Sequence, residues 1–579
     1  MIRNCFRIKK FSVRFSSTIS SKPSYYHRVE GESFQYLTIG QLLKQATEKY
    51  GDRQAFISCE EKSQISFNEA LHKANKLASG LLNLGLEKGD RVAIWSPNFE
   101  FWYTSYMAIA RAGLICVTLN PAYTIPELNF CLNKVGVKAI ISPEVFRKQQ
   151  HYEMLSTLIP QLKNSKAGKI EGNATNSLQH VITVSDKKLP GAINFLELLN
   201  LSSENDLIKV EELQSSISVD DGSMIQFTSG TTGQPKATLL SHFAMVNSSY
   251  YSAIRNSLDK IYMKCSSPLP FFHVGGSIVS VLGSLHFGAT LVSPSPHFDG
   301  EAMLRSIVNE KCNMMIGTPT FFVDLWSKQR ALNLKIPEIL IACVGGSLLS
   351  PQIVKDLETI LKVKKISSVY GLTETSSVIM QTLPGDSNQS VEEFVGTVSK
   401  NVEAKIIDRD GKTVNFGEPG ELCIRTSLNM LCYFNDPEKT KEVMGDDRWL
   451  KTGDQFILYE NGYGKVVGRI KDMIIRGGEN IFPKEIEDYL NTHEDIAETQ
   501  VIGIPDDRMG EEVGAFIKLK DSSKTLTQND IKEFCKNNLA HFKVPKFVII
   551  VEDFPKTLSG KIQKFKFLEF YADKLKNLE

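Results

Sequence analysis

The sequence has 579 residues, of which 42% are hydrophobic and 23% are charged. This length predicts about three to five structural units, and the composition excludes a disordered, collagen-like or coiled-coil chain. Lys and Arg number 67 against 66 Asp and Glu, and the net charge of +1 argues against general nucleic-acid binding. The ten cysteines have no zinc-ligand spacing, and no charge-free apolar run has the length of a transmembrane helix. These features favour a large soluble enzyme in a reducing compartment.

The amino terminus differs from the rest of the chain in charge. The first acidic residue is Glu30, and seven Lys or Arg and six Ser precede it. An acid-free, Arg- and Ser-rich amphipathic start is typical of a mitochondrial transit peptide. Residues 1–28 are therefore predicted to direct the protein to the mitochondrial matrix, and the alternative is an unstructured basic tail.

Apolar periodicity predicts helices over 38–90, interrupted by a strand at 55–57. Further helices alternate with three short buried strands at 92–95, 114–117 and 139–141. Residues 160–218 are polar and weakly patterned, so we expect a surface excursion there. The alternation resumes from Met224 to about residue 380, which predicts parallel sheets with crossover helices.

The residue pattern changes again towards the carboxyl terminus. Short β-like runs between Gly, Asp and Asn turns predict a β-rich subdomain at about 395–468. A final α+β segment follows. The predicted fold class is α/β, with a large domain of two αβ sheets plus the β-rich subdomain over 29–470. A small α+β domain is predicted over 471–579.

Residues 224–236 combine an apolar strand with a loop rich in glycine and hydroxyl groups. Glycines let the backbone bend around an anion and present its amides, and a lysine adds charge for a phosphate oxygen. The loop lacks the GxxxxGK[ST] pattern of nucleotide hydrolases, and taken alone it could be a linker. The predicted phosphate-binding residues are Thr228, Ser229, Gly230, Thr231, Thr232, Gly233, Gln234, Pro235 and Lys236.

This loop resembles the TSGTTGxPK signature of the adenylate-forming enzymes, which include acyl-CoA synthetases, firefly luciferase and peptide-synthetase adenylation domains. Four further family elements follow in the family's order, at Tyr370–Thr375, Thr452–Asp454, Gly468–Asp472 and Ser559–Lys561. Each is weak alone, but five in order exclude coincidence. One departure is Ala237, where the family usually has glycine; alanine fits if its backbone φ is negative.

The resemblance implies roles for residues in these elements. Tyr370 would stack on adenine, and Glu374 would help hold Mg²⁺, a cation that prefers oxygen ligands. Asp454 would accept hydrogen bonds from the ribose hydroxyls, and Arg469 would contact the ribose or a phosphate. Lys471 occupies the family's hinge position between the large and small domains. The implied ATP-binding set is completed by Gly346, Gly371, Thr373 and Lys561.

Three further sites concern the acyl group and its transfer. Lys561 would bridge the substrate carboxylate and the α-phosphate, where the barrier is largely electrostatic because the carboxylate is already ionised. His273 lies in a segment resembling the family's PxxHxxG element and would bear on the carboxylate, although a histidine beside phenylalanine can also be a core residue. The resemblance implies that Gly477, Gly478 and Glu479 line the pantetheine tunnel for coenzyme A.

The resemblance is strongest to the mitochondrial medium-chain acyl-CoA ligases, and it is carried by residues 317–320, 471–480, 507–512 and 559–566. It implies ATP-dependent activation of a fatty acid, through an acyl-adenylate, to acyl-CoA, AMP and pyrophosphate. ATP, Mg²⁺ and coenzyme A would be required, with small molecules as the only predicted partners. The alternatives are a ligase for aryl or branched carboxylic acids and a non-catalytic acyl-binding protein on the same fold.

Overall fold

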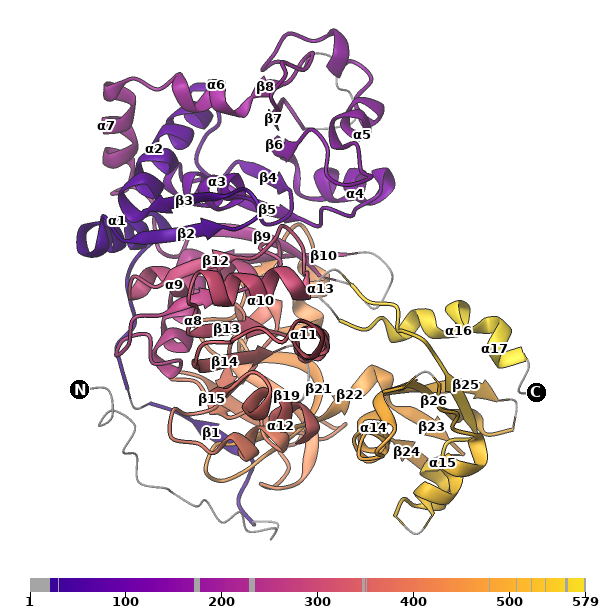
Figure 1. Ribbon diagram of the computed structural model, residues 1–579. Helices are drawn as coiled ribbons and strands as arrows, with labels where there is room; N and C mark the ends of the chain where they lie inside the picture. The colour runs from indigo at the N-terminus through magenta and orange to yellow at the C-terminus, as the bar shows by residue number, and fades with distance from the viewer. Residues whose placement is uncertain are drawn as a thin grey trace.

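The computed structural model describes residues 21–29, 31–170, 177–228, 235–345, 349, 351–477, 479–506, 508–521, 523–536, 538–557 and 561–576 (Figure 1). Most of the predicted transit segment lies outside these residues. Its described part contains β1 (Tyr25–His27), which pairs antiparallel with β18 (Glu403–Ile407). Residues Tyr25–His27, at the end of the predicted transit segment, therefore belong to a folded sheet.

The first large sheet has eight strands in the order β20-β10-β9-β5-β4-β6-β7-β8. Neighbours from β9 to β8 are parallel, as the alternating pattern predicts. The strands are β4 (Arg91–Trp95), β5 (Ile115–Leu119), β6 (Val137–Pro143), β7 (His180–Val184), β8 (Ile193–Asn194), β9 (Gly222–Thr228), β10 (Lys236–Ser241) and β20 (Cys432–Tyr433). The associated helices are α3 (Glu100–Arg111), α4 (Ile125–Val135), α5 (His151–Leu158), α6 (Phe195–Asn200) and α7 (Glu204–Leu213).

The prediction of a surface excursion at 160–218 is wrong. Strand β7 is almost entirely buried and extends the parallel sheet beside β6. The helix α7 packs on α2 (Phe67–Asn83), and its Glu211 forms an ion pair with the buried Arg111. The apolar residues of this segment are few and occur in short runs, so periodicity alone did not predict β7 and α7.

The second large sheet has nine strands in the order β17-β16-β15-β14-β13-β11-β12-β2-β3. Its six central strands, from β15 to β2, are parallel. The strands are β2 (Gln54–Ser58), β3 (Ser63–Ser66), β11 (Lys264–Ser266), β12 (Thr290–Ser293), β13 (Met314–Gly317), β14 (Ile339–Gly345), β15 (Val363–Tyr370), β16 (Met380–Gln381) and β17 (Thr397–Val398).

The helices associated with this sheet include one of an uncommon type, the π-helix η3 (Gly275–Leu282). The others are α1 (Ile39–Tyr50), α2, α8 (His242–Arg255), α9 (Gly283–His286), α10 (Gly300–Asn309), α11 (Pro319–Leu332) and α12 (Pro351–Thr359). The largest core cluster joins the two sheets, because it includes Phe56 of β2, Ile94 of β4 and Trp102 of α3. The apolar stretch from Gly275 is mostly buried.

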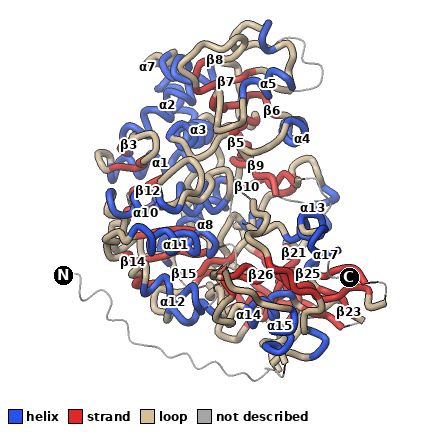
Figure 2. Tube along the Cα trace, turned by 45° about the vertical axis from the view of Figure 1, so that its right-hand side comes forward, coloured by secondary structure: helices blue, strands red, loops and turns tan. Residues whose placement is uncertain are grey.

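Two smaller sheets complete the molecule. The β-rich subdomain has the order β1-β18-β19-β21-β22, with β19 (Pro419–Arg425), β21 (Leu450–Leu458), β22 (Gly464–Arg469) and helix α13 (Pro437–Val443). The last sheet has the order β24-β23-β26-β25, with β27 beside β26. Figure 2 shows its strands β23, β25 and β26 near α14 and α15. Its elements are β23 (Ile474–Arg476), β24 (Glu479–Ile481), α14 (Pro483–Leu490), β25 (Ile496–Asp506), β26 (Gly510–Leu519), α15 (Gln528–Cys535), β27 (Phe547–Ile550), α16 (Phe567–Phe570) and α17 (Ala572–Lys576).

This architecture confirms the predicted α/β fold class with a small α+β part at the carboxyl end. The short 3₁₀ helix η6 (Ile470–Asp472) connects β22 to β23. The parallel strands β13, β14 and β15 end at the same edge of their sheet, at Gly317, Gly345 and Tyr370. In open α/β sheets this carboxyl edge is where ligands bind, and it is where the predicted motifs meet.

Candidate active site

The predicted phosphate loop connects β9 to β10. These strands form an antiparallel pair in which Thr228 is opposite Lys236, so the loop leaves and re-enters the sheet at one point. Its predicted residues Ser229, Gly230, Thr231, Thr232, Gly233 and Gln234 lie outside the described residues. Pro235 and Lys236 follow them. Ala237 pairs with Phe227 within β10 and is not among the residues of positive φ, so alanine fits at this position.

Tyr433 of β20 links Lys236 to Glu374, the predicted metal ligand. The Lys236 Nζ lies 4.9 Å from the centre of the Tyr433 ring, which is cation–π distance. The Tyr433 hydroxyl donates a 2.8 Å hydrogen bond to Glu374 Oε1. One aromatic side chain thus contacts both a cation and a carboxylate of the predicted site. Sequence reasoning missed Tyr433, because it belongs to none of the family elements.

Tyr370, Asp454 and Arg469 come together from three strands. The Tyr370 hydroxyl donates to Asp454 Oδ2 at 2.6 Å, and Arg469 Nε lies 2.7 Å from Asp454 Oδ1. Burial raises the pKa of Asp454, whereas Arg469 and Tyr370 oppose that shift by favouring the charged form. The carboxylate is therefore buried but paired, as a fixed hydrogen-bond acceptor must be.

Lys561 belongs to the small carboxyl-terminal part and lies near enough to this group for Asp454 and Arg469 to influence its pKa. The Thr557 amide donates to the Lys561 carbonyl at 2.8 Å, and Lys556 forms a β-bridge with Ile562. Ser559 and Gly560 lie outside the described residues. The surrounding protein lowers the pKa of Lys561, Arg469 adds to the shift, and the carboxylates of Glu374 and Asp454 oppose it. Lys561 is thus electrostatically coupled to residues of three motifs, although its side chain keeps contact with solvent.

His273 lies just before η3, in a segment held by buried polar side chains. Gln226 of β9 donates to the Phe272 carbonyl and accepts from the Val274 amide at 3.0 Å. The His273 Nδ1 accepts from the Gly275 amide at 3.3 Å, which leaves the ring proton of the neutral form on Nε2. Burial, and secondarily Lys561, lower the pKa of His273 to about 3. The ring is therefore neutral near pH 7, and Gln226 is a positioning residue that the sequence analysis missed.

The remaining predicted residues are placed as follows. Thr373 is buried in a short 3₁₀ turn before Glu374. Gly371 has no room for a side chain, because a Cβ there would lie 1.5 Å from the Ser377 carbonyl oxygen. Gly346 and Gly478 lie outside the described residues. Among those that are described, no cluster of three His, Cys, Asp or Glu could hold a metal ion, and no helix is long and apolar enough to cross a membrane.

Lys471 and the predicted tunnel residues stand apart from the group formed by Tyr370, Asp454 and Arg469. Lys471 is exposed in η6, between the β-rich subdomain and the last sheet. Gly477 lies between β23 and β24 with a φ of 58°, and its amide donates to the Met509 carbonyl at 2.8 Å. Glu479 is the first residue of β24. The structure therefore brings together the adenylation residues but not these three.

Two family models match the chain. The model for AMP-binding enzymes matches residues 43–434, and the model for the AMP-binding enzyme C-terminal domain matches residues 485–561. The chain belongs to the AMP-binding enzyme family. The Danio rerio protein "Medium-chain acyl-CoA ligase ACSF2, mitochondrial" is 38% identical to this AMP-binding enzyme over 552 residues, which cover 94% of this chain and 90% of the relative.

Solved structures share the whole architecture of this AMP-binding enzyme. The ATP-bound MatB structure from Rhodopseudomonas palustris matches with a TM-score of 0.76 and 25% identity, covering 93% of this chain and 100% of MatB. The anthranilate CoA ligase AuaEII, in complex with anthranoyl-AMP, matches with a TM-score of 0.79 and 21% identity, covering 94% and 98% of the two chains. These matches confirm the predicted family and fold.

Proposed function

We propose that this AMP-binding enzyme is an AMP-forming acyl-CoA synthetase that activates a medium-chain fatty acid. The fatty acid and ATP form an acyl-adenylate and pyrophosphate, and coenzyme A then takes the acyl group and releases AMP. The observation that carries the proposal is the hydrogen-bonded group of Tyr370, Asp454 and Arg469, which lies near enough to Lys561 for Asp454 and Arg469 to influence the pKa of the lysine. The similarity to medium-chain acyl-CoA ligases over nearly the full chain supports the same reaction.

The arrangement of charges suits attack by a carboxylate on a phosphate. Both reactants are anions and repel one another. The activation barrier therefore falls when fixed cations face the negative charge of the carboxylate and the phosphate. Lys236 lies in β10 of the first large sheet, Lys561 lies in the carboxyl-terminal part, and Arg469 is held by Asp454. Asp454 accepts hydrogen bonds, which suits a role in holding the ribose hydroxyls. Tyr370 lies beside it with its ring close to Phe456, which suits a stacking surface for adenine.

Glu374 fits the proposed magnesium site. Proteins commonly bind Mg²⁺ through one or two carboxylates together with substrate phosphates, so a single glutamate, linked through Tyr433 to Lys236, is sufficient. The bound ion would neutralise phosphate charge. Tyr433 would fix the carboxylate through its hydrogen bond to Oε1, and this contact leaves Oε2 for the metal.

We infer that neutral His273 bears on the substrate carboxylate. Its Nε2–H can donate to a carboxylate oxygen without adding a competing charge beside Lys561. Gln226 keeps the segment of His273 in place by bonding on both sides of it. The same contacts position η3, which forms one wall of the proposed acyl site.

For the second half-reaction we propose that the carboxyl-terminal domain turns about Lys471 and brings Gly477, Gly478 and Glu479 to the cleft. A few residues between domains can absorb the change in backbone angles. Lys471 lies in the connection between β22 and β23, which supports the hinge position. The domain limits that we propose remain 29–470 and 471–579, except that the fold includes β1 from Tyr25.

We further propose that the enzyme works in the mitochondrial matrix. The acid-free start of the sequence supports this location, as does the similar protein from Danio rerio, whose name includes "mitochondrial". Because β1 pairs with β18, the removable segment would end before Tyr25.

A panel of acids tests the proposed reaction. Straight-chain fatty acids of increasing length, with aryl and branched acids beside them, are incubated with ATP, Mg²⁺ and coenzyme A. Pyrophosphate and CoA esters are measured separately. We expect both products, with the highest kcat/KM for straight chains of medium length. If kcat/KM were highest for aryl or branched acids, the proposed substrate class would be wrong. If no acid led to pyrophosphate release, the proposed ligase activity would be refuted.

A further inference from the structure

Three buried polar side chains converge on the segment between β11 and η3 that carries His273. They are Asn98 after β4, Thr118 in β5 and Gln226 in β9, and none is more than 2% exposed. Thr118 and Gln226 are register partners on adjacent parallel strands, so their side chains lie on the same face of the first large sheet. The three residues therefore meet this segment from the carboxyl ends of neighbouring strands.

Asn98 holds the first part of the segment. Its Nδ2 donates to the Leu269 carbonyl at 2.9 Å, and its Oδ1 accepts from the Phe271 amide at 2.8 Å. The Phe271 side chain is fully buried, with its ring centre 5.3 Å from that of Trp102. Buried backbone outside helices and strands needs such polar partners. One asparagine and one buried ring thus fix the chain two residues before His273.

Thr118 and Gln226 hold the peptide groups on both sides of His273. The Thr118 hydroxyl donates to the Phe272 carbonyl at 3.0 Å, and Gln226 donates to the same carbonyl. Gln226 also accepts from the Val274 amide at 3.0 Å. The Phe272 carbonyl belongs to the planar peptide group that leads into His273. A change in the orientation of that group would therefore displace the imidazole ring.

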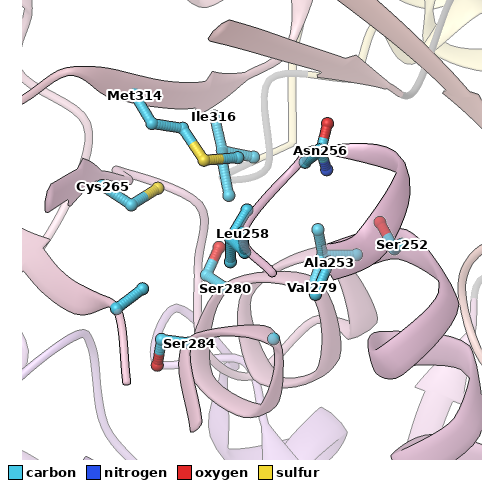
Figure 3. Close-up of a pocket in the computed structure, with 12 residues that line it drawn as sticks. Ser252, Ala253, Asn256, Leu258, Cys265, Val279, Ser280, Ser284, Met314 and Ile316 are labelled. Atoms are coloured by element: carbon cyan, nitrogen blue, oxygen red, sulfur yellow. The ribbon is translucent and has the colours of Figure 1, made fainter. Parts of the chain in front are cut away.

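Helix η3, which follows this segment, packs closely against the second large sheet. Figure 3 shows Val279 and Ser280 of η3 on one side of a small cavity, with Met314 and Ile316 of β13 on the other. The cavity volume is about 10 Å³, which is the space of a single water molecule. Movement of η3 towards β13 is therefore restricted. The segment before η3 is fixed between this helix and the three polar side chains.

We propose that Asn98 and Thr118 are positioning residues for activation of the fatty acid and act through His273. Together with Gln226, they hold the imidazole where its Nε2–H can donate to the substrate carboxylate. A displacement of about 1 Å can remove most of the effect of a catalytic group. Lys561 contributes to the lowered pKa of His273, which supports a position of the ring near the proposed reaction. The inference rests on the proposed function, because it requires His273 to contact the substrate.

The test is a double-mutant cycle that measures kcat/KM for pyrophosphate release from a medium-chain fatty acid by the full-length enzyme. Thr118→Val keeps the shape of the side chain but removes the hydroxyl, and we expect kcat/KM to fall about three- to tenfold. Thr118→Ser retains the hydroxyl and should keep kcat/KM close to the wild-type value. In a His273→Ala background, Thr118→Val should cause no further fall, because the side chain that Thr118 positions is absent.

Two matched variants control for the loss of a buried polar side chain elsewhere. Thr183 of β7 is 1% exposed, and its hydroxyl has no hydrogen-bond partner within the described part of the chain. Asn247 is fully buried and bonds to the amide and the carbonyl of Gln35. Asn98→Leu should lower kcat/KM at least as much as Thr118→Val. Thr183→Val and Asn247→Leu should leave it unchanged.

Two results overturn the inference. One is an unchanged kcat/KM in both Thr118→Val and Asn98→Leu. The other is an equal fall on Thr118→Val in the wild-type and His273→Ala backgrounds, which would give the hydroxyl a purely structural role. The threonine variant keeps the test open if Asn98→Leu does not fold. Failure of the proposed function gives a different result, with which the inference also falls: His273→Ala alone would release pyrophosphate normally, or the wild-type enzyme would release none.

Discussion

At the scale of single residues, the charged side chains of the proposed active site lie in different environments. Asp454 is buried and paired, whereas Lys561 reaches the same group from another domain and keeps contact with solvent. Desolvation by the surrounding protein lowers the pKa of Lys561, and the carboxylates of Glu374 and Asp454 oppose this shift by favouring the charged form. A cation held by the enzyme in this way is available to stabilise charge that develops between two anionic substrates.

The substitution Lys561→Ala should therefore separate the two half-reactions. We expect pyrophosphate release to fall by at least about a hundredfold, the usual loss for one electrostatic group aimed at a transition state. CoA ester formation from supplied acyl-adenylate should persist, because that step needs no contact with the α-phosphate as pyrophosphate leaves. Lys566→Ala serves as the control, since Lys566 lies five residues away beside Phe565. Normal pyrophosphate release by Lys561→Ala would refute its role.

The sequence predicted the residues of the family elements but not those that support them. Tyr370, Asp454, Arg469 and Lys561 stand in short recognisable strings, so their roles followed from the resemblance. Tyr433 bonds to a residue 59 positions away, and Gln226 bonds to two residues 46 and 48 positions away. No local pattern encodes such contacts, since they arise only when β20 and β9 take their places in the sheet.

At the scale of elements, long amphipathic segments and short buried strands were predicted well, whereas short strands at sheet edges were not. The helices predicted over 38–90 include α2, which begins at a capping box formed by Ser66 and Glu69 and ends at Asn83. Strand β3 has four residues and pairs at a sheet edge, and β1 lies in the segment predicted as a leader. Such strands depend on their neighbours for stability. The π-helical form of η3 was likewise not predictable from its apolar composition.

The turn between β23 and β24 allows the proposed coenzyme A path to be tested separately. Gly477 has a φ of 58°, and a Cβ there would meet the flexible Met509 Cε at 2.6 Å. Gly477→Leu should spare pyrophosphate release and lower CoA ester formation about tenfold or more, because a bulky side chain would fill the close approach that glycine allows.

A matched variant controls for backbone strain in that experiment. Gly411 also has a positive φ, of 79°, but a Cβ added there would have no other atom within 4 Å. Gly411→Leu should therefore impose similar strain without changing either half-reaction. If Gly477→Leu reduced both half-reactions equally, Gly477 would have no special role in the transfer to coenzyme A.

At the scale of the whole molecule, three of the buried histidines of the large domain lie in different places. His151 stacks on Trp95 with ring centres 3.9 Å apart, His242 accepts from the Ile39 amide, and His286 bonds to Ser249. Burial lowers the pKa of His151 and His242 to about 4 and that of His286 to about 3. All three therefore stay neutral in the folded protein under mildly acidic conditions.

Acid should consequently destabilise the large domain. Below about pH 6.5 the unfolded chain binds a proton at each of these histidines while the folded chain does not, so stability falls as the pH drops towards about 4. Each histidine contributes a slope of about 1.4 kcal/mol per pH unit in this window. Denaturant midpoints measured between pH 7 and pH 5 should show this decline. His286→Gln should flatten it, whatever its stability at pH 7, while His72→Gln, at an exposed position, should not. An unchanged slope in His286→Gln would mean that His286 takes up a proton in the folded protein as readily as in the unfolded chain.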